Sequence, residues 1–221
     1  MPPSKDSKRR MLVEGMDDQY TIINLLKQHG VDWDDSSTSP PYIHKCGGID
    51  NLLNQISVTV KGAEYTDIAI VVDANGSIQD RWKSLRGRFA DADIELPEQL
   101  DTTGTVVVDR AKSRNIGLWI MPDNTMNGAL EDFVVNMMPE SDRLLDYAQC
   151  ASKKAKKYGA KFDDIDLPKA TLHAWLAWQN TSGVPYGTAI NNGFLRSDNE
   201  CALRFVGWFD RVFPGLVNTA S

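Results

Sequence analysis

The sequence is poor in cysteine and has no long apolar run. Its three cysteines, Cys46, Cys150 and Cys201, form no CxxC motif and no even-numbered set for a disulfide framework. This usage fits a reducing compartment, so we expect a cytoplasmic protein. Apolar runs stay below about ten residues, whereas a membrane helix needs roughly 20, so we expect no membrane partner. The basic amino terminus is not followed by an apolar segment, so we expect no secretory signal.

Several motifs with a known chemistry are also missing. No GxxxxGK(S/T) loop occurs, which excludes an ATPase site of the chain's own. The three histidines, His29, His44 and His173, have no spacing typical of metal ligands. The chain has no internal repeat and no low-complexity segment. The net charge of −6 does not by itself indicate a nucleic-acid-binding protein.

Length and apolar content predict a folded globule. The chain has 221 residues, of which 42% are hydrophobic, and it contains six tryptophans. This is enough to bury a sizeable core in one elaborated domain or in two small ones. Strand and helix patterns alternate over residues 8–138, which predicts an α/β fold with a mainly parallel sheet flanked by helices. From residue 142 onward the pattern is helical and rich in aromatic residues.

The expected elements follow from apolar runs and from the Gly, Pro or Asn residues that end them. We expect a third strand that ends at Asp73 and other strands over residues 8–13, 42–46 and 116–121. Residues 105–109 are either a short strand or one arm of a hairpin. Helices are expected over residues 17–26, 49–56, 77–89 and 128–138. The expected organisation is a disordered basic tail (1–7), an α/β core (8–140) and a helical carboxyl-terminal part packed on it (141–221).

Three apolar runs end in a carboxylate, and this repetition is the most informative feature of the chain. Glu14 follows the first run, Asp73 the run that starts at Ile68, and Asp123 the run that starts at Ile116. The carboxyl ends of parallel strands face one crevice, where ligands bind in such sheets. Convergent carboxylate oxygens are the ligands that a hard divalent cation such as Mg²⁺ needs. We therefore expect these three acids to line one metal site.

These residues resemble the TOPRIM domain. Glu14 with Gly15 is similar to the glutamate motif of that domain, and residues 73–75 stand in the place of its Asp-x-Asp motif. The resemblance is narrower to small standalone TOPRIM-like proteins related to the OLD nucleases, and it is carried by residues 13–18, 119–124, 128–132 and 169–177. It spans most of the chain, about residues 8–214.

The resemblance implies a compact, Rossmann-like α/β domain that holds one or two Mg²⁺ (or Mn²⁺) ions and cuts nucleic acid. It implies that Glu14 and Asp73 are catalytic, Asp73 as a direct ligand and Glu14 as a ligand or general acid/base. The ion would polarise the phosphate and lower the pKa of a bound water. The implied metal ligands are Glu14, Asp73, Asn75, Asp123, Glu131 and Asp132.

Asn75 departs from the family pattern, because the motif has an acid at this position. Asn can ligate through its carbonyl oxygen but brings no negative charge, and this weakens the attraction for a divalent cation. Asp17, Asp18 and Asp80 are near enough in the sequence to compensate. Asp17 and Asp18 are most simply explained as acids at the start of a helix, where they favour the helix dipole.

Two basic segments stand out in this acidic chain. Arg81 and Lys83 follow the Asp73 turn, and a second group contains Lys153, Lys154 and Lys157. Basic patches beside an acidic metal site are compatible with contacts to a phosphate backbone, and equally with solvated helix faces. As nucleic-acid contacts these five residues would serve a DNA or RNA substrate, of which DNA is favoured.

Three functions are compatible with the sequence. The leading one is a Mg²⁺-dependent nuclease of the TOPRIM/OLD type, for which the resemblance implies an ATPase partner protein and a role in defence against phage. The second is a non-catalytic TOPRIM-like module that binds nucleic acid or a partner protein. A primase-like nucleotidyl transferase is the third, but no zinc-binding or nucleotide-specific segment supports it. The aromatics of the carboxyl-terminal part would form a homo-oligomer or partner interface if exposed, and core if buried.

Overall fold

The computed structural model describes residues 5–35 and 37–218. The chain forms a five-stranded sheet in the order β2-β1-β3-β5-β4, in which only β4 is antiparallel to its neighbour. The predicted α/β fold with a mainly parallel sheet is confirmed. In chain order the strands are β1 (Arg9–Val13), β2 (Tyr42–Lys45), β3 (Asp67–Asp73), β4 (Thr105–Asp109) and β5 (Arg114–Met121).

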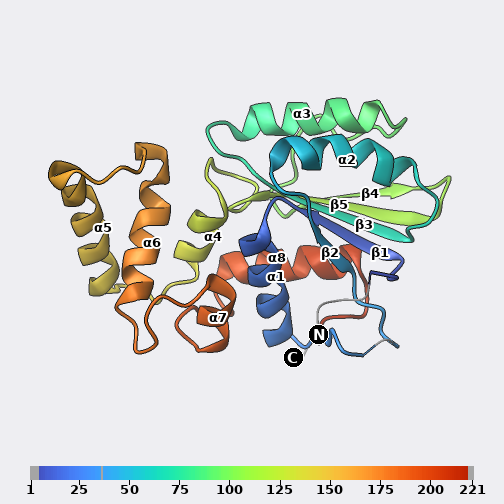
Figure 1. Cartoon of the computed structure of the whole chain (residues 1–221). Helices are drawn as coiled ribbons and strands as arrows, with labels where there is room; N and C mark the ends of the chain where they lie inside the picture. Colours follow the sequence, from blue (N-terminus) through green and yellow to red (C-terminus); the bar gives the residue numbers. More distant parts are fainter. Residues whose placement is uncertain (1–4, 36, 219–221) are drawn as a thin grey trace.

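Helices cover both faces of the sheet (Figure 1). One face carries α2 (Ile49–Lys61) and α3 (Ile78–Ala90). The other face carries α1 (Met16–Gln28) and α8 (Glu200–Val212). The short helix α7 (Tyr186–Asn191) packs against α1. The sheet is therefore a buried middle layer, which leaves its edges as the places where backbone and side chains reach a ligand.

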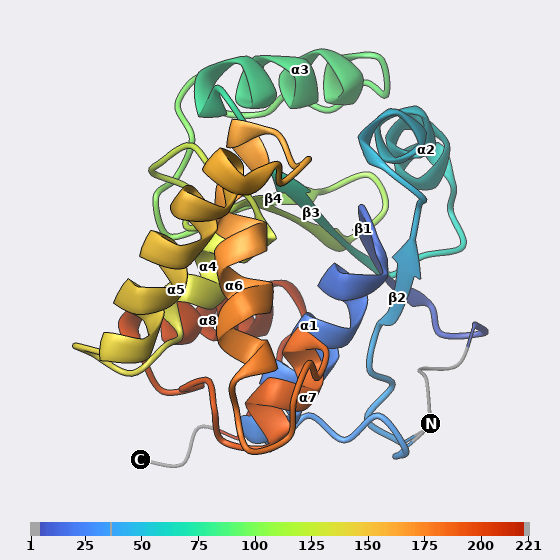
Figure 2. The same cartoon turned by 60° about the vertical axis from the view of Figure 1, so that its left-hand side comes forward.

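A helical extension projects beyond the edge at which β1, β3 and β5 end (Figure 1). Helix α4 (Leu130–Asn136) follows β5, and α5 (Arg143–Ala155) lies beside α6 (Leu167–Ala177). Two single 3₁₀ turns, η1 (Lys156–Tyr158) and η2 (Asp164–Asp166), connect α5 to α6. Seen from the side of the extension, α5 and α6 stand in front of this edge of the sheet (Figure 2).

The apolar run of β3 is buried on both faces of the sheet. Ile68, Ile70 and Val72 pack with the α2 and α3 side, whereas Ala69 and Val71 pack with the α1 and α8 side. Successive side chains of a strand point to opposite faces, so a strand covered on both sides needs a continuous apolar run. This burial fixes the register of β1, β3 and β5 and brings their carboxyl ends to one edge.

Helix α8 contributes directly to the core beneath the sheet. Phe205 and Trp208 lie against Trp119 of β5, with ring centroids 5.2 and 5.6 Å away. Gly117 of β5 permits this close packing, because a Cβ atom there would lie 2.2 Å from the Val212 side chain. The aromatic residues of α8 are therefore core residues and form no exposed interface.

The structure resolves the open points of the expected elements. Residues 105–109 are a hairpin arm, because β4 runs antiparallel to β5. The helix expected over residues 128–138 is the shorter α4, since Gly128 has a φ of 143° and pairs with Asn75 instead. Residues 1–4 of the predicted tail lie outside the described residues, and Ser7 Oγ donates a hydrogen bond to the carbonyl of Pro40. Within residues 5–35 and 37–218, no helix combines the length and apolarity that a bilayer crossing requires.

Candidate functional site

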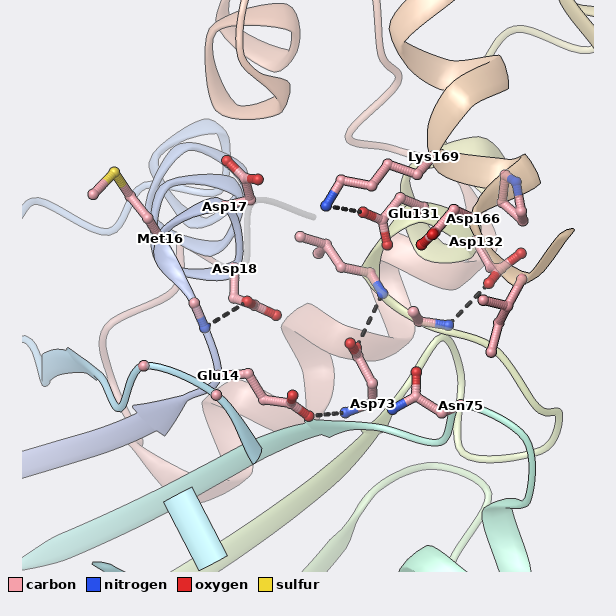
Figure 3. Close-up of a pocket in the computed structure, with 17 residues that line it drawn as sticks. Glu14, Met16, Asp17, Asp18, Asp73, Asn75, Glu131, Asp132, Asp166 and Lys169 are labelled. Atoms are coloured by element: carbon pink, nitrogen blue, oxygen red, sulfur yellow. Dashed lines mark hydrogen bonds and ion pairs between the residues drawn. The ribbon is translucent and has the colours of Figure 1, made fainter. Parts of the chain in front are cut away.

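A pocket of about 550 Å³ opens at the carboxyl edge of the sheet, between the ends of β1 and β3 (Figure 3). The starts of α1 and α4, the glycines after β2, and the segment from η2 into α6 form its walls. Five of the predicted site residues line it together: Glu14, Asp73, Asn75, Glu131 and Asp132. Asp17, Asp18, Asp166 and Lys169 also line it.

Glu14 stands directly after β1 and reaches across to the neighbouring strand. Its Oε1 accepts a hydrogen bond of 2.9 Å from the backbone N–H of Asp73. Burial raises the pKa of the Glu14 carboxyl, and this outweighs the lowering by that hydrogen bond and by Arg81. The end of β1 is thus tied to the end of β3 by a carboxylate that is poorly solvated.

Asp73 is the last residue of β3 and lies at the centre of the acidic pocket. Its Oδ1 accepts a hydrogen bond of 3.0 Å from the N–H of Leu130, the first residue of α4. Burial, and then the charges of Asp18, Glu14 and Glu131, raise its pKa to about 8. The strand end therefore carries a carboxylate that three other acids crowd.

Asp18 is the fourth member of this group, although the sequence favoured a helix-start acid and named it only as one of three acids that could compensate for Asn75. Its Oδ2 accepts a hydrogen bond of 2.9 Å from the N–H of Gly15, which places the carboxylate over the first turn of α1. Only 7% of Asp18 is exposed, and its burial is the largest cause that raises its pKa to about 6. The one signal in the sequence is the spacing of four residues between Glu14 and Asp18. At this spacing a side chain in the first helical turn lies on the same side as the strand end.

Glu131 and Asp132 occupy the first turn of α4 but make different contacts. Asp132 accepts a hydrogen bond of 2.9 Å from the N–H of Ala129, the residue before the helix. Glu131 forms an ion pair of 3.5 Å with Lys169 of α6, which the predicted site did not contain. Asn75 lines the pocket beside Asp73, and its backbone pairs with Gly128. Figure 3 shows the carboxylates of these segments around one space.

Asp123 does not join the other acids, which corrects the expectation that it ligates the same metal. Its Oδ1 accepts hydrogen bonds from the N–H and the hydroxyl of Thr125, at 2.9 and 2.8 Å, and a third from the N–H of Met126. Its Oδ2 pairs with Arg204 of α8 at 3.2 Å. Burial opposes ionisation, but these hydrogen bonds outweigh it and lower the pKa of Asp123. The carboxylate is therefore used to build its own turn.

The predicted basic contacts lie at different distances from the pocket. Arg81 is adjacent to it, since its Nε donates a hydrogen bond of 2.8 Å to the carbonyl of Asp73. Lys83 lines a separate groove along α3. Lys153, Lys154 and Lys157 are exposed at the end of α5 and in η1, and Lys154 lines a third groove. The pocket therefore has only Arg81 from the predicted basic set beside it.

The donor chemistry of the pocket fits Mg²⁺ or Mn²⁺, because its side chains are hard carboxylate oxygens. As the side chains stand, the described part of the chain holds no group of three or more His, Cys, Asp or Glu residues arranged to bind a metal ion. Glu14, Asp18 and Asp73 each have one oxygen bonded to a backbone N–H. Their second oxygens are the donors that would turn toward a cation.

The fold and the site define an α/β protein with a crowded acidic pocket at the carboxyl edge of a mainly parallel sheet. A family model described as a protein of unknown function (DUF3226) matches residues 8–214, and the chain belongs to this family. No curated protein and no solved structure matches the chain.

Proposed function

We propose that the protein is a Mg²⁺- or Mn²⁺-dependent nuclease that cleaves phosphodiester bonds, with DNA as the favoured substrate. The observation that carries the proposal is the convergence of Glu14, Asp18, Asp73 and Glu131 on one pocket. They come from the ends of two neighbouring parallel strands and from the starts of two helices. Carboxylate oxygens are the ligands that a hard divalent cation takes, and the carboxyl edge of such a sheet is where ligands bind.

The electrostatics of the pocket favour a cation. Burial and the repulsion by three acids raise the pKa of Asp73 to about 8, so the group holds a proton near neutral pH. Lys169 is the basic side chain paired with an acid inside the pocket, and it balances Glu131 alone. A divalent ion would replace the proton on Asp73 and relieve the repulsion, which is the usual linkage between metal binding and deprotonation.

The chain's own residues have separable roles in this proposal. Asp73 and Asp18 would hold the ion through their second oxygens, and Asn75 would add a neutral oxygen beside Asp73. Glu14, whose pKa burial raises, would hold the ion or move a proton. Arg81, fixed to the carbonyl of Asp73, would contact a phosphate oxygen. The bound ion would polarise the phosphate and activate a water.

The resemblance to TOPRIM domains of OLD-type proteins supports the same reading. It carries the choice of nucleic acid as substrate, of a separate ATPase as partner protein and of defence against phage as the biological role. These finer points rest on family resemblance, whereas the acidic pocket rests on the geometry of this chain. The proposed cytoplasmic location rests on the cysteine usage instead.

A plasmid-nicking assay in Mg²⁺ and in Mn²⁺ tests the proposal. We expect cleavage by the wild type and a loss of at least about 100-fold in Glu14→Ala and Asp73→Asn, since each removes a group that positions the ion. Asp123→Asn is the matched control, because it makes the same chemical change at the same sheet edge but outside the pocket. Equal cleavage by wild type, Glu14→Ala and Asp73→Asn would sink the nuclease proposal.

A second candidate function is a non-catalytic module that binds nucleic acid or a partner protein. The observation in its favour is that Glu14, Asp18, Asp73 and Asp132 each accept a hydrogen bond from a backbone N–H, so all four have a structural use without a metal. Metal-independent binding of nucleic acid with no cleavage in either cation is the result that this candidate predicts.

A further inference from the structure

The outer face of α5 carries a groove that the acidic pocket does not use. It has a volume of about 570 Å³ and is lined at helical spacing by Tyr147, Cys150, Lys154 and Tyr158. The two tyrosines are 64% and 80% exposed. A cluster of exposed aromatic side chains marks a contact surface, whereas single exposed apolar residues need no explanation.

A third aromatic residue extends this surface and supports one of the tyrosines. The Trp178 ring, just after α6, lies 5.5 Å from the Tyr147 ring at an interplanar angle of 40°. Trp178 is itself 44% exposed. The Tyr147 ring of α5 therefore contacts an aromatic neighbour at the end of α6 while most of the residue stays accessible for stacking.

Lys154 lines the groove, and two further exposed lysines, Lys153 and Lys157, lie beside it in the sequence of α5 and η1. Lys153, Lys154 and Lys157 are exposed and form no ion pair with any residue in the described ranges. Lys156, in contrast, is used internally, since its Nζ pairs with Asp164 at 3.1 Å and donates to the carbonyl of Phe162. In a chain with a net charge of −6, these three lysines are a local surplus of positive charge.

The segment that connects α5 to α6 contributes residues to both the groove and the acidic pocket. Tyr158 ends η1, and the ion pair between Lys156 and Asp164 fastens η1 to η2. The next residues of η2, Ile165 and Asp166, line the acidic pocket. Figure 2 shows this connection at the end of the α5 and α6 pair, in front of the sheet edge. The groove is therefore joined to the acidic pocket through η1 and η2, and an extended polymer bound along α5 would lead from the tyrosines toward this connection.

We propose that this groove binds single-stranded nucleic acid, with bases stacked on Tyr147 and Tyr158 and phosphates held by Lys153, Lys154 and Lys157. Stacking on aromatic side chains needs unpaired bases, because the base faces are covered in a duplex. The lysines supply the charge that a phosphate backbone requires. Binding is independent of the metal, and only the use of the bound strand as a substrate rests on the proposed function.

Fluorescence anisotropy with a labelled oligothymidylate and a labelled duplex of the same length, both in EDTA, tests this groove. We expect the single strand to bind at least about tenfold more tightly than the duplex. Tyr147→Ala combined with Tyr158→Ala weakens single-strand binding by about tenfold or more, whereas the corresponding double Phe variant keeps it, because the rings remain.

The contribution of the lysines is measured separately, from the salt dependence of the affinity for the single strand. Lys153→Ala combined with Lys154→Ala lowers the slope of log affinity against log salt by about 1.4, because two phosphate contacts on a single strand are lost. Lys27→Ala combined with Lys61→Ala removes the same charge from other helices and leaves the slope of the wild type.

Three results would overturn the groove: no binding of the oligonucleotide, equal affinity for strand and duplex, or an unchanged affinity of the double Tyr→Ala variant. A wild-type dimer that this variant converts to a monomer would also overturn it, since the face would then be a self-interface. Metal-dependent nicking without binding of the oligonucleotide in the groove would contradict the groove proposal and leave the nuclease proposal standing. Groove binding without metal-dependent cleavage supports the groove proposal and contradicts the nuclease.

Discussion

Asp73 is the acid of the pocket whose pKa is raised to about 8 by burial and by the neighbouring charges. Its pKa is about 8 in the folded protein, against an ordinary value of 3.8. Between these two values the folded state binds more protons than the unfolded state, so the free energy of unfolding falls as pH rises. Without metal, the penalty from ionising Asp73 is absent below this window and fully present above it.

Replacement of Asp73 by Asn is therefore expected to flatten the pH dependence of stability in EDTA. The wild type loses up to about 1.4 kcal/mol per pH unit inside the window, and Asn cannot titrate but still accepts from Leu130. Urea unfolding at a series of pH values from mildly acidic to mildly alkaline measures this. Asp123→Asn serves as the control with the wild-type slope there, because the pKa of Asp123 is lowered. A wild type that gains stability toward alkaline pH would disagree with a crowded acidic pocket.

Asn75 is the residue that limits the negative charge of the pocket. Asn75→Asp keeps the shape of the side chain, and Asp tolerates the left-handed backbone at φ 52°. The added carboxylate beside Asp73 is expected to tighten Mn²⁺ binding by about tenfold, or about 1.4 kcal/mol, and to lower the stability of the metal-free protein. Calorimetric titration measures the first effect and thermal unfolding in EDTA the second. Unchanged affinity would show that position 75 does not face the ion.

The sequence predicted the approach of Glu14 and Asp73, and it placed Asp123 in the same site, which is wrong. It named Asp18 only as a helix-start acid that could compensate for Asn75. The first two follow buried runs on adjacent parallel strands, so strand order alone brings them together. Asp18 has the same local pattern as any acid that favours a helix dipole, and only the path of β1 into α1 turns it inward. Asp123 ends a strand in the same way, yet its turn consumes the carboxylate.

At the scale of elements, the cap of α5 also bonds to α6, against which α5 packs. Asp142 accepts hydrogen bonds from the N–H groups of Leu144 and Leu145 at the start of α5. Its second oxygen accepts a bond of 2.8 Å from Nε1 of Trp175 on α6, and Trp175 is buried. One side chain thus caps a helix and satisfies a buried donor on its neighbour.

Asp142→Ala is therefore expected to lower the free energy of unfolding by about 2–3 kcal/mol, of which the cap and the orphaned indole N–H each contribute about 1 kcal/mol or more. Urea unfolding measures the change, and amide hydrogen exchange locates it in α5 and α6. Asp146→Ala, an exposed acid in the same first turn, is the control and stays within about 0.5 kcal/mol of the wild type. Equal losses in both variants would refute the capping role.

Most element positions follow from local patterns, whereas their directions in space do not. The end of β3 at Asp73 and, within one residue, the start of α1 at Met16 follow from the length of the apolar runs and from the turn residues beside them. The antiparallel direction of β4 depends on how its loops close, which a five-residue run does not encode. The direction in which α5 and α6 extend from the sheet likewise depends on tertiary packing and not on their local sequence.

At the scale of the molecule, the carboxyl-terminal helices are part of the same core as the sheet. Trp119 of β5 and Phe133 of α4 pack against Phe205 of α8. A fragment of residues 1–140 would expose this face of the sheet, and the apolar area lost is a large part of a small core. We expect that fragment to show no cooperative unfolding transition.

The matched fragment is residues 8–214, the range of the family match, which keeps α8 and is expected to unfold like the whole chain. Circular dichroism in the near ultraviolet, followed during urea unfolding, compares the two, because the packed tryptophans give a signal only in a fixed environment. A sharp transition in the 1–140 fragment would mean that α8 is an addition to an independently stable core.

Divalent cation binding at the acidic pocket is the claim on which the function depends, and calorimetric titration with Mn²⁺ tests it without a substrate or a partner protein. We expect binding by the wild type at mildly alkaline pH, release of protons on binding, and loss of binding in Asp73→Asn but not in Asp123→Asn. Absence of binding by the wild type, or identical binding by wild type and Asp73→Asn, would contradict this claim.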